Sequence, residues 1–389
     1  MTGLLRTRTG EEAKVGTVEL FFDLVFVFAI TQLSHTLIAH PSLLGAVETL
    51  LLFLAVWWVW IFTCWVTNWL DPERWRVRLL LFALMACGLV LSMSIPTAWG
   101  AGGLIFAIAY VTMQVGRSLY MVVVMRRHNP AGFRNFVRIT LWLSVSALFW
   151  IAGGLADGLA RLGLWALGLA IEYTGPSARF PVPGLGRSST ADWDVEGGHM
   201  AERSGLFIII ALGESILITG ATMAEMPWTV PALLAFASAF LSSVAMWWLY
   251  FNIGAQRAGH MIAHHDDPGR VARLAYTYAP IPIVAGIIVS AASDEMLLAH
   301  PAGHITAAAW ATTIGGVALF LLGNIAFKRA TWRNMPFSHL VGFGLLAALA
   351  LLPIHDGYVL GLGAALVLVI VAIWETRSLG GAGDAQTSA

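Results

Sequence analysis

Apolar stretches long enough to cross a lipid bilayer recur along nearly the whole chain. A membrane helix needs about 20 apolar residues, and about twelve such stretches lie between short polar segments. They cover residues 18–38, 43–66, 78–97, 101–125, 138–156, 159–174, 203–222, 228–251, 274–292, 304–326, 337–354 and 357–375. Because a backbone in lipid satisfies its polar groups only in helices or closed barrels, the pattern predicts an all-α integral membrane protein.

The proportion of charged residues agrees with this class. Only 11% of the residues are charged and 58% are hydrophobic, whereas a soluble domain carries about 25% charged residues. The lipid bilayer is therefore the main expected partner, and no nucleic-acid partner is expected. Cys64 and Cys87 both fall inside predicted spans, so neither a disulfide framework nor a cysteine metal site is expected.

The basic residues predict the orientation of the chain. When the N-terminus is placed inside, every Lys and Arg except Arg161 falls in an inner tail, an inner loop or an inner helix end, as the positive-inside rule describes. Residues 1–17 are polar and lack the features of a signal peptide. We therefore expect a multi-pass protein of the inner (plasma) membrane with cytoplasmic N- and C-termini and a disordered C-terminal tail over residues 376–389.

Landmarks in the first half of the chain return in the same order in the second half. The pairs are Glu19 and Glu202, Trp57–Trp60 and Trp247–Tyr250, Asp71–Arg74 and Asp267–Arg270, and Gly102-Gly103 and Gly315-Gly316. They predict two six-helix repeats, residues 18–174 and 201–375, joined by a cytoplasmic linker over 175–200. Six is an even number, so the repeats would run parallel, a plan known from transporters. The alternative is chance similarity between apolar sequences.

Three charged residues lie inside predicted spans near the inner side. Glu19 and Asp23 are one helical turn apart in the first span, and Arg117 lies well inside the fourth. A charge at the centre of a membrane helix costs roughly 2.5–3.5 kcal/mol on insertion scales. We therefore predict an ion pair between Arg117 and these acids, which either locks two spans together or forms an inner gate.

A second polar group is predicted near the middle of the membrane. Glu214 is the deepest acid of the chain, and alignment of the repeats places Thr31 and Gln32 opposite Glu214 and Ser215. Thr219 follows Ser215 at helical spacing. One interpretation is a cation or proton pathway between the first and seventh spans. The other is a hydrogen-bonded Glu that holds helices together.

The histidines give less specific predictions. His35 shares a helix face with Thr31 and is of a type that titrates near neutral pH. His264–Asp267, and His199 with Glu202, contain metal-ligand types without a defined geometry, so solvated loops are the favoured interpretation. The sequence has no Ser-His-Asp arrangement, cysteine nucleophile or His-x-x-x-His pair within the spans. We therefore expect no catalytic residue, metal or cofactor, and the protein is not expected to be an enzyme.

Several motifs resemble one family over almost the entire chain. They are E-L-F-F-D-L-V-F-V-F-A-I-T-Q-L-S-H at 19–35, N-W-L-D-P-E-R at 68–74, P-G-L-G-R-S at 183–188, G-G-H-x-x-E-R at 197–203, A-L-G-E-S-I-L-I-T-G-A-T at 211–222 and A-Y-T-Y at 275–278. The chain is similar here to the bacterial low temperature requirement A (LtrA) proteins. The resemblance implies a polytopic bacterial inner-membrane protein, and the family is named for a cold-growth phenotype that fixes no mechanism.

The first span also resembles a second family, in one helix only. Phe21–Phe26 is similar to the F-S-D motif in the first helix of a family of lysosomal and bacterial potassium channels, which are built from six-helix repeats. Phe22 stands where that motif has Ser, and Gly205 and Leu206 replace the motif in the second repeat.

Together these patterns favour a channel or transporter for a small solute. A cation or proton is favoured because the predicted buried charge is mostly acidic. The alternatives are a non-transporting stress or accessory protein of the membrane and an enzyme that acts on lipid. The sequence is equally compatible with a monomer and a homodimer.

Overall fold

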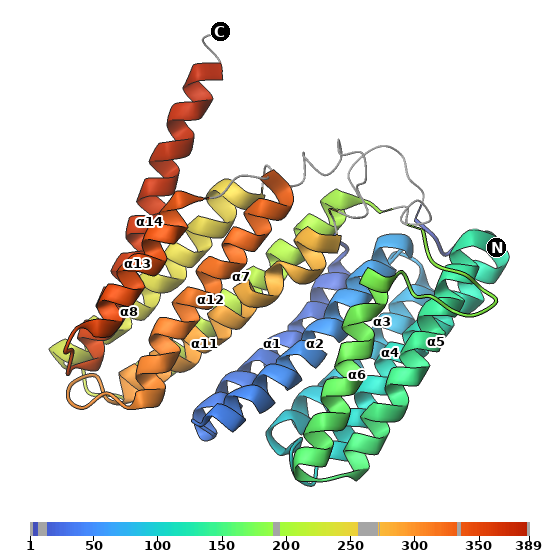
Figure 1. The fold of residues 1–389 in the computed structure, drawn as a ribbon, viewed down its shortest axis with the longest axis horizontal. Helices are drawn as coiled ribbons and strands as arrows, with labels where there is room; N and C mark the ends of the chain where they lie inside the picture. Colours follow the sequence, from blue (N-terminus) through green and yellow to red (C-terminus); the bar gives the residue numbers. More distant parts are fainter. Residues whose placement is uncertain are drawn as a thin grey trace. The chain divides into compact units, whose positions relative to one another are not determined.

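The structure is a computed structural model that describes residues 3–6, 14–189, 195–255, 271, 273–332 and 336–386. Within these residues the chain forms twelve α-helices, and the only β pairing is two isolated bridges. The chain divides into two compact units (Figure 1). The first holds the described residues up to Arg203 together with Val271, and the second holds the described residues from Ser204 on apart from Val271.

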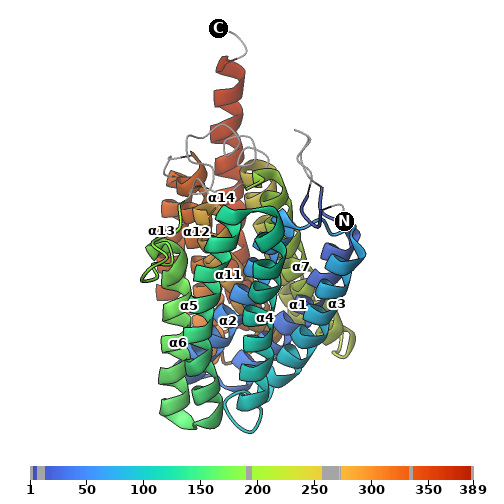
Figure 2. The same cartoon turned by 90° about the vertical axis from the view of Figure 1, so that its right-hand side faces the viewer.

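The first unit is a helical bundle around α2. Its helices are α1 (Thr17–Ala39), α2 (Leu43–Trp69), α3 (Trp75–Ser94), α4 (Gly103–His128), α5 (Pro130–Leu155), α6 (Gly158–Ala178) and the start of α7 (Gly197–Ala224). Helix α1 packs on α2 and α3, and the contacts then continue from α3 through α4 and α5 to α6. Helices α4 and α6 also pack on α2, which lies behind them in Figure 2. Accordingly, 83% of the residues in the apolar stretch of α2 are buried, more than in any other described span.

Polar residues in the sequence set where several helices begin. The Ser42 side chain accepts a hydrogen bond from Gly45 N at 3.0 Å at the start of α2. Asn129 does the same for the first turn of α5, directly before Pro130. Such caps satisfy backbone N–H groups that have no partner in the first helical turn, so these helices start at defined positions.

The second unit contains the rest of α7 and the remaining elements. They are α8 (Val230–Trp247), the π-helices η3 (Trp248–Ala255) and η4 (Arg273–Tyr278), α11 (Pro280–Ala299), α12 (Ala307–Trp332), α13 (Phe337–Leu351) and α14 (Gly357–Gln386). Helix α14 packs on α8, α11, α12 and α13, and α11 packs along α12. Glycines make the α11–α12 contact close, since a Cβ at Gly286 would lie 2.5 Å from Phe320 N.

The structure confirms an all-helical membrane protein but modifies the predicted spans. Among the described helices, ten are long and apolar enough to cross a membrane. The predicted sixth and eleventh spans are helices α6 and α13, which are not among the ten. Helix α13 has only 15 residues, and α6 carries the buried charges Arg161 and Glu172. Helix α14 continues to Gln386, whereas the sequence predicted a disordered tail from residue 376. The parallel repeat stays a prediction.

The close packing of α11 on α12 gives a testable prediction. A Cβ at Gly316 would lie 2.8 Å from Ser290 N, whereas a Cβ at the neighbouring Gly315 would meet nothing within 4 Å. We expect Gly316→Ala to lower stability by about 1–3 kcal/mol, because α11 and α12 must separate. Gly315→Ala, the matched control, should leave stability unchanged or raise it, because Ala is the better helix former. Thermal melting of the purified protein in detergent measures both, and equal melting temperatures would contradict the packing described.

Candidate functional site

Helix α1 brings two acids into the interior of the first unit. Glu19 and Asp23 are four residues apart, and four residues separate neighbours on one helix face. Both side chains are fully buried, as are Phe22 and Phe26 between and beyond them. Glu19 Oε2 also accepts a hydrogen bond from Gly16 N at 2.8 Å, so it caps α1 from inside the fold.

Arg203 is the partner of both acids. It lies in α7, and its guanidinium is fully buried. Arg203 Nη1 lies 3.0 Å from Glu19 Oε1, and Nη2 lies 2.6 Å from Asp23 Oδ1. The planar, forked guanidinium can hold two carboxylates at once in this way, so one side chain of α7 ties down two successive turns of α1.

His199, one helical turn before Arg203, contacts Glu19 as well. Its Nε2 lies 2.9 Å from Glu19 Oε1, and Asn68 Nδ2 of α2 lies 3.2 Å from its Nδ1. Asn68 also donates to the carbonyl of Glu196 and accepts from its N–H, at 2.9 and 3.1 Å. The end of α2 therefore fixes the start of α7, and with it the direction in which His199 and Arg203 point.

Arg6 completes the set from the N-terminal segment. Its Nη2 lies 2.9 Å from Glu19 Oε2, and its Nε donates to the carbonyls of Thr67 and Leu70 at the end of α2. We call Arg6, Glu19, Asp23, His199 and Arg203 the charge cluster. With His199 neutral it holds two carboxylates and two guanidiniums, so its charges cancel. Such compensation is what allows charges to remain in a low-dielectric interior.

One carboxylate of the charge cluster keeps an unused oxygen. Asp23 Oδ1 accepts from Arg203 and from Trp60 Nε1, the latter at 2.8 Å. Asp23 Oδ2 and Arg203 Nε are buried and have no hydrogen-bond partner among the described residues. Buried polar atoms are nearly always paired, so Asp23 Oδ2 is an acceptor that can still take a proton or a hydrogen bond, and Arg203 Nε–H is a donor that can still give one.

The predicted ion pair of Arg117 with Glu19 and Asp23 is wrong. Arg117 Nη1 donates to the Val59 carbonyl at 2.9 Å and to Thr63 Oγ1 at 2.8 Å, both on α2. Helix α4 packs against α2, α3 and α5, and the guanidinium points to α2. The positions of Arg117, Glu19 and Asp23 within their predicted spans place them at a similar depth in the membrane. A similar depth does not determine which neighbouring helix a side chain faces.

Arg117 instead belongs to a separate polar network. Its Nη2 donates to Gln114 Oε1, and Gln114 Nε2 donates to Glu172 Oε2 at 2.7 Å. Glu172 of α6 also accepts hydrogen bonds from Tyr110, Ser146 and Trp150. The hydrogen bonds to Glu172 from the described residues come from α4 and α5, so this acid joins three helices. The sequence analysis made no prediction for Glu172.

The remaining predicted residues of the first unit lie outside the charge cluster. Glu202 is exposed and accepts a hydrogen bond from Val15 N at 3.0 Å. Thr31 donates to the Val27 carbonyl of its own helix at 3.1 Å. Gln32 is half-buried and His35 is exposed.

Three residues of the polar group that the sequence predicts near the middle of the membrane lie in the second unit: Glu214, Ser215 and Thr219. Glu214 is buried, Ser215 Oγ lies 3.4 Å from Ser243 Oγ, and Thr219 donates to the Ser215 carbonyl. Thr31 and Gln32 belong to the first unit. The pathway that would combine the two sets therefore stays a prediction.

The second unit has a buried ion pair that the sequence analysis missed. Lys328 Nζ of α12 lies 2.5 Å from Glu375 Oε1 and 2.7 Å from Oε2 on α14. His339 Nε2 of α13 lies 3.4 Å from the same ammonium. Lys328, Glu375 and His339 are all buried, so the ion pair and His339 together connect α12, α13 and α14.

One signal in the sequence could have identified the partner of the two acids. His199 and Arg203 are separated by four residues, as are Glu19 and Asp23. Residues four apart lie on one face of a helix, so one face of α7 presents hydrogen-bond donors at the same spacing as the acids on α1. Among the described residues, no group of three or more His, Cys, Asp or Glu is arranged to hold a metal ion. The predicted solvated loop at His264–Asp267 lies outside the described residues.

Comparisons with known proteins agree with the resemblance seen in the motifs. Residues 14–373 match the family model described as bacterial low temperature requirement A protein (LtrA). The chain is also 44% identical over 381 residues to an uncharacterized protein, RA0937, of Rhizobium meliloti (strain 1021). That match covers 97% of this chain and 93% of the relative. No solved structure matches the chain.

The charge cluster predicts a large effect of removing its central cation. We expect Arg203→Gln to destabilise the protein by about 3–5 kcal/mol, because two buried carboxylates lose their shared partner. Arg74→Gln is the matched control. It removes the same group from a half-exposed pair with Asp71, which is worth about 0–1 kcal/mol. Melting temperatures of the two purified variants test this. A similar decrease in melting temperature for both variants would contradict the burial of Arg203 in the charge cluster.

The pair in the second unit predicts a recovery in a double variant. Lys328→Met alone should cost about 3–5 kcal/mol, because it leaves the carboxylate of Glu375 buried without a cation. Lys328→Met combined with Glu375→Met removes both charges and should restore most of that stability. Chemical or thermal denaturation of the single and double variants measures the difference. A double variant less stable than either single one would exclude the pairing.

Proposed function

The chain belongs to the bacterial low temperature requirement A family, and from that premise we propose that it is a membrane transporter or channel for a small cation, the proton above all. The observation that carries this proposal is the carboxylate of Asp23. It is fully buried in a helix that can cross a membrane, and one of its oxygens lacks a hydrogen-bond partner among the described residues.

Acids inside membrane helices usually mark ion pathways or proton relays. A purely structural network is most stable when every buried polar group is satisfied, and Glu19 meets this condition with Arg6, His199, Arg203 and Gly16 N. Asp23 does not. Its open oxygen can take a proton while Arg203, which stays charged at any physiological pH, keeps its contact with Glu19.

We further propose on which side of the membrane the pathway begins. The distribution of Lys and Arg supports a cytoplasmic N-terminus in a bacterial inner membrane. The charge cluster, at the start of α1, would then lie near the cytoplasmic side. Thr31 and Gln32, further along α1, are candidates for continuing the pathway toward the middle of the membrane, since hydroxyl and amide groups can relay a cation.

A second candidate function is a non-transporting accessory protein. The specific observation in its favour is that the charge cluster balances two carboxylates with two guanidiniums. A balanced network contributes to helix packing without any movement of ions. The two functions differ in one measurable property, since only a transporter gives flux across a sealed membrane.

Flux in liposomes tests the proposal. We expect purified protein in sealed liposomes to dissipate an imposed proton, potassium or sodium gradient, read with a pH-sensitive dye or an ion-selective electrode. Asp23→Asn should lower the flux at least tenfold, because an amide cannot exchange a proton at this position. Glu73→Gln, which removes a carboxylate that is 66% exposed, should leave the flux unchanged.

Each outcome has a definite meaning. Melting temperature and elution volume show whether each variant is folded before its flux is read. No flux of any of the three ions with folded wild-type protein would exclude transport of these cations and favour the accessory function. Unchanged flux in folded Asp23→Asn would exclude Asp23 as the exchanging group.

A further inference from the structure

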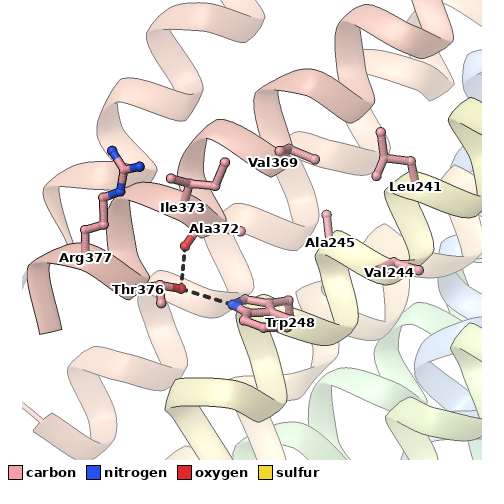
Figure 3. A pocket seen from close by; sticks show the side chains of 9 residues that line it. All are labelled: Leu241, Val244, Ala245, Trp248, Val369, Ala372, Ile373, Thr376 and Arg377. Carbon is pink, nitrogen blue, oxygen red and sulfur yellow. Dashed lines mark hydrogen bonds between the residues drawn. The ribbon is translucent and has the colours of Figure 1, made fainter. Parts of the chain in front are cut away.

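A groove between α8 and α14 in the second unit is lined almost entirely by apolar side chains (Figure 3). Its volume is about 290 Å³. Six of the lining residues are aliphatic: Leu241, Val244, Ala245, Val369, Ala372 and Ile373. Ala245 and Ala372 reach no further than Cβ, so two neighbouring helices leave space between them that larger residues would fill.

One end of the groove is polar. Trp248 Nε1 donates a hydrogen bond to Thr376 Oγ1 at 3.0 Å, and Arg377 follows directly. Figure 3 shows Arg377 and Leu241 at opposite ends of the groove. Arg377 is exposed and has no hydrogen bond or ion pair with any described residue of the chain. The groove therefore combines an apolar lining with one cationic end.

The position of this end in the membrane follows from the neighbouring tryptophans. Trp247 and Trp374 are 43% and 46% exposed, and exposed Trp side chains are enriched at the boundary between hydrocarbon and water. The apolar span of α14 runs from Gly357 to Ser378, so Arg377 lies at its last turn. The aliphatic part of the groove then lies at the depth of acyl chains, and Arg377 lies at the depth of lipid headgroups.

We propose that this groove is a binding site for an anionic phospholipid, with one acyl chain between α8 and α14 and the phosphate on Arg377. The lining from Leu241 to Trp248 covers about 10 Å along the helix axis at 1.5 Å per residue, which accommodates the upper part of one chain. Charge complementarity selects the headgroup, because a basic side chain beside a groove between membrane helices attracts anionic lipid. The site does not depend on the proposed transport activity.

Native mass spectrometry of the full chain, purified with defined lipids, tests this site. We expect wild-type protein to retain phosphatidylglycerol about fivefold more than phosphatidylcholine of the same chain length, since ~1 kcal/mol per basic residue corresponds to that ratio. Arg377→Gln should bring the ratio near one. Val244→Trp, which fills the groove from a position that is 41% exposed, should reduce retention of both lipids.

Arg329→Gln is the matched control, because Arg329 is an exposed Arg in the last turn of α12 and does not line the groove. It should retain the wild-type ratio. An equal loss in Arg329→Gln would mean that surface charge in general attracts the lipid, and the proposal would be wrong. A wild-type ratio of one would also overturn it. So would a dimer that Val244→Trp dissociates, since a second copy of the chain would then occupy the groove.

Discussion

A charge that leaves water for the interior of a membrane protein must find its partner within the protein, and Arg203 meets this requirement for the first unit. Its guanidinium contacts Glu19 and Asp23 on α1. Two other local arrangements support this contact. Asn68 orients the start of α7, and Arg6 neutralises the second charge of the pair of acids. Without these supports the acids would carry the full cost of desolvation.

The second unit meets the same constraint with a different cation. Lys328 is a compact ammonium, and both oxygens of a single carboxylate, Glu375, surround it. A guanidinium presents a wider fork and can divide its N–H groups between two acids, which is the arrangement of Arg203. The choice of cation therefore has a consequence. The carboxylate beside Lys328 uses both oxygens, whereas Asp23 shares Arg203 with Glu19 and keeps one oxygen open. Asp23 thus keeps a capacity to accept a hydrogen bond that Glu375 has used up.

The sequence predicted most helices because the bilayer fixes both their length and their composition. It overestimated α6 and α13, since an apolar stretch interrupted by charge or cut to 15 residues still resembles a span. Glu19 and Asp23 were found because acids are conspicuous in apolar sequence. Their partner was missed for a local reason. The predicted span began at residue 203, but α7 begins at Gly197, which moves Arg203 from a helix end into the interior. Helix packing, which sequence periodicity does not reveal, then decided between Arg203 and Arg117.

The charge balance of the cluster also limits how Asp23 could exchange a proton. Uptake of a proton by Asp23 would leave two guanidiniums with one carboxylate, and a net charge is costly in a low dielectric. Of the two cations only Arg6 has access to solvent, with 14% of its side chain exposed, so Arg6 is the group that can move outward and restore neutrality. Arg6 also binds the carbonyls of Thr67 and Leu70. Under the proposed function, protonation in the interior would therefore be transmitted to the N-terminal segment and the end of α2 through one side chain.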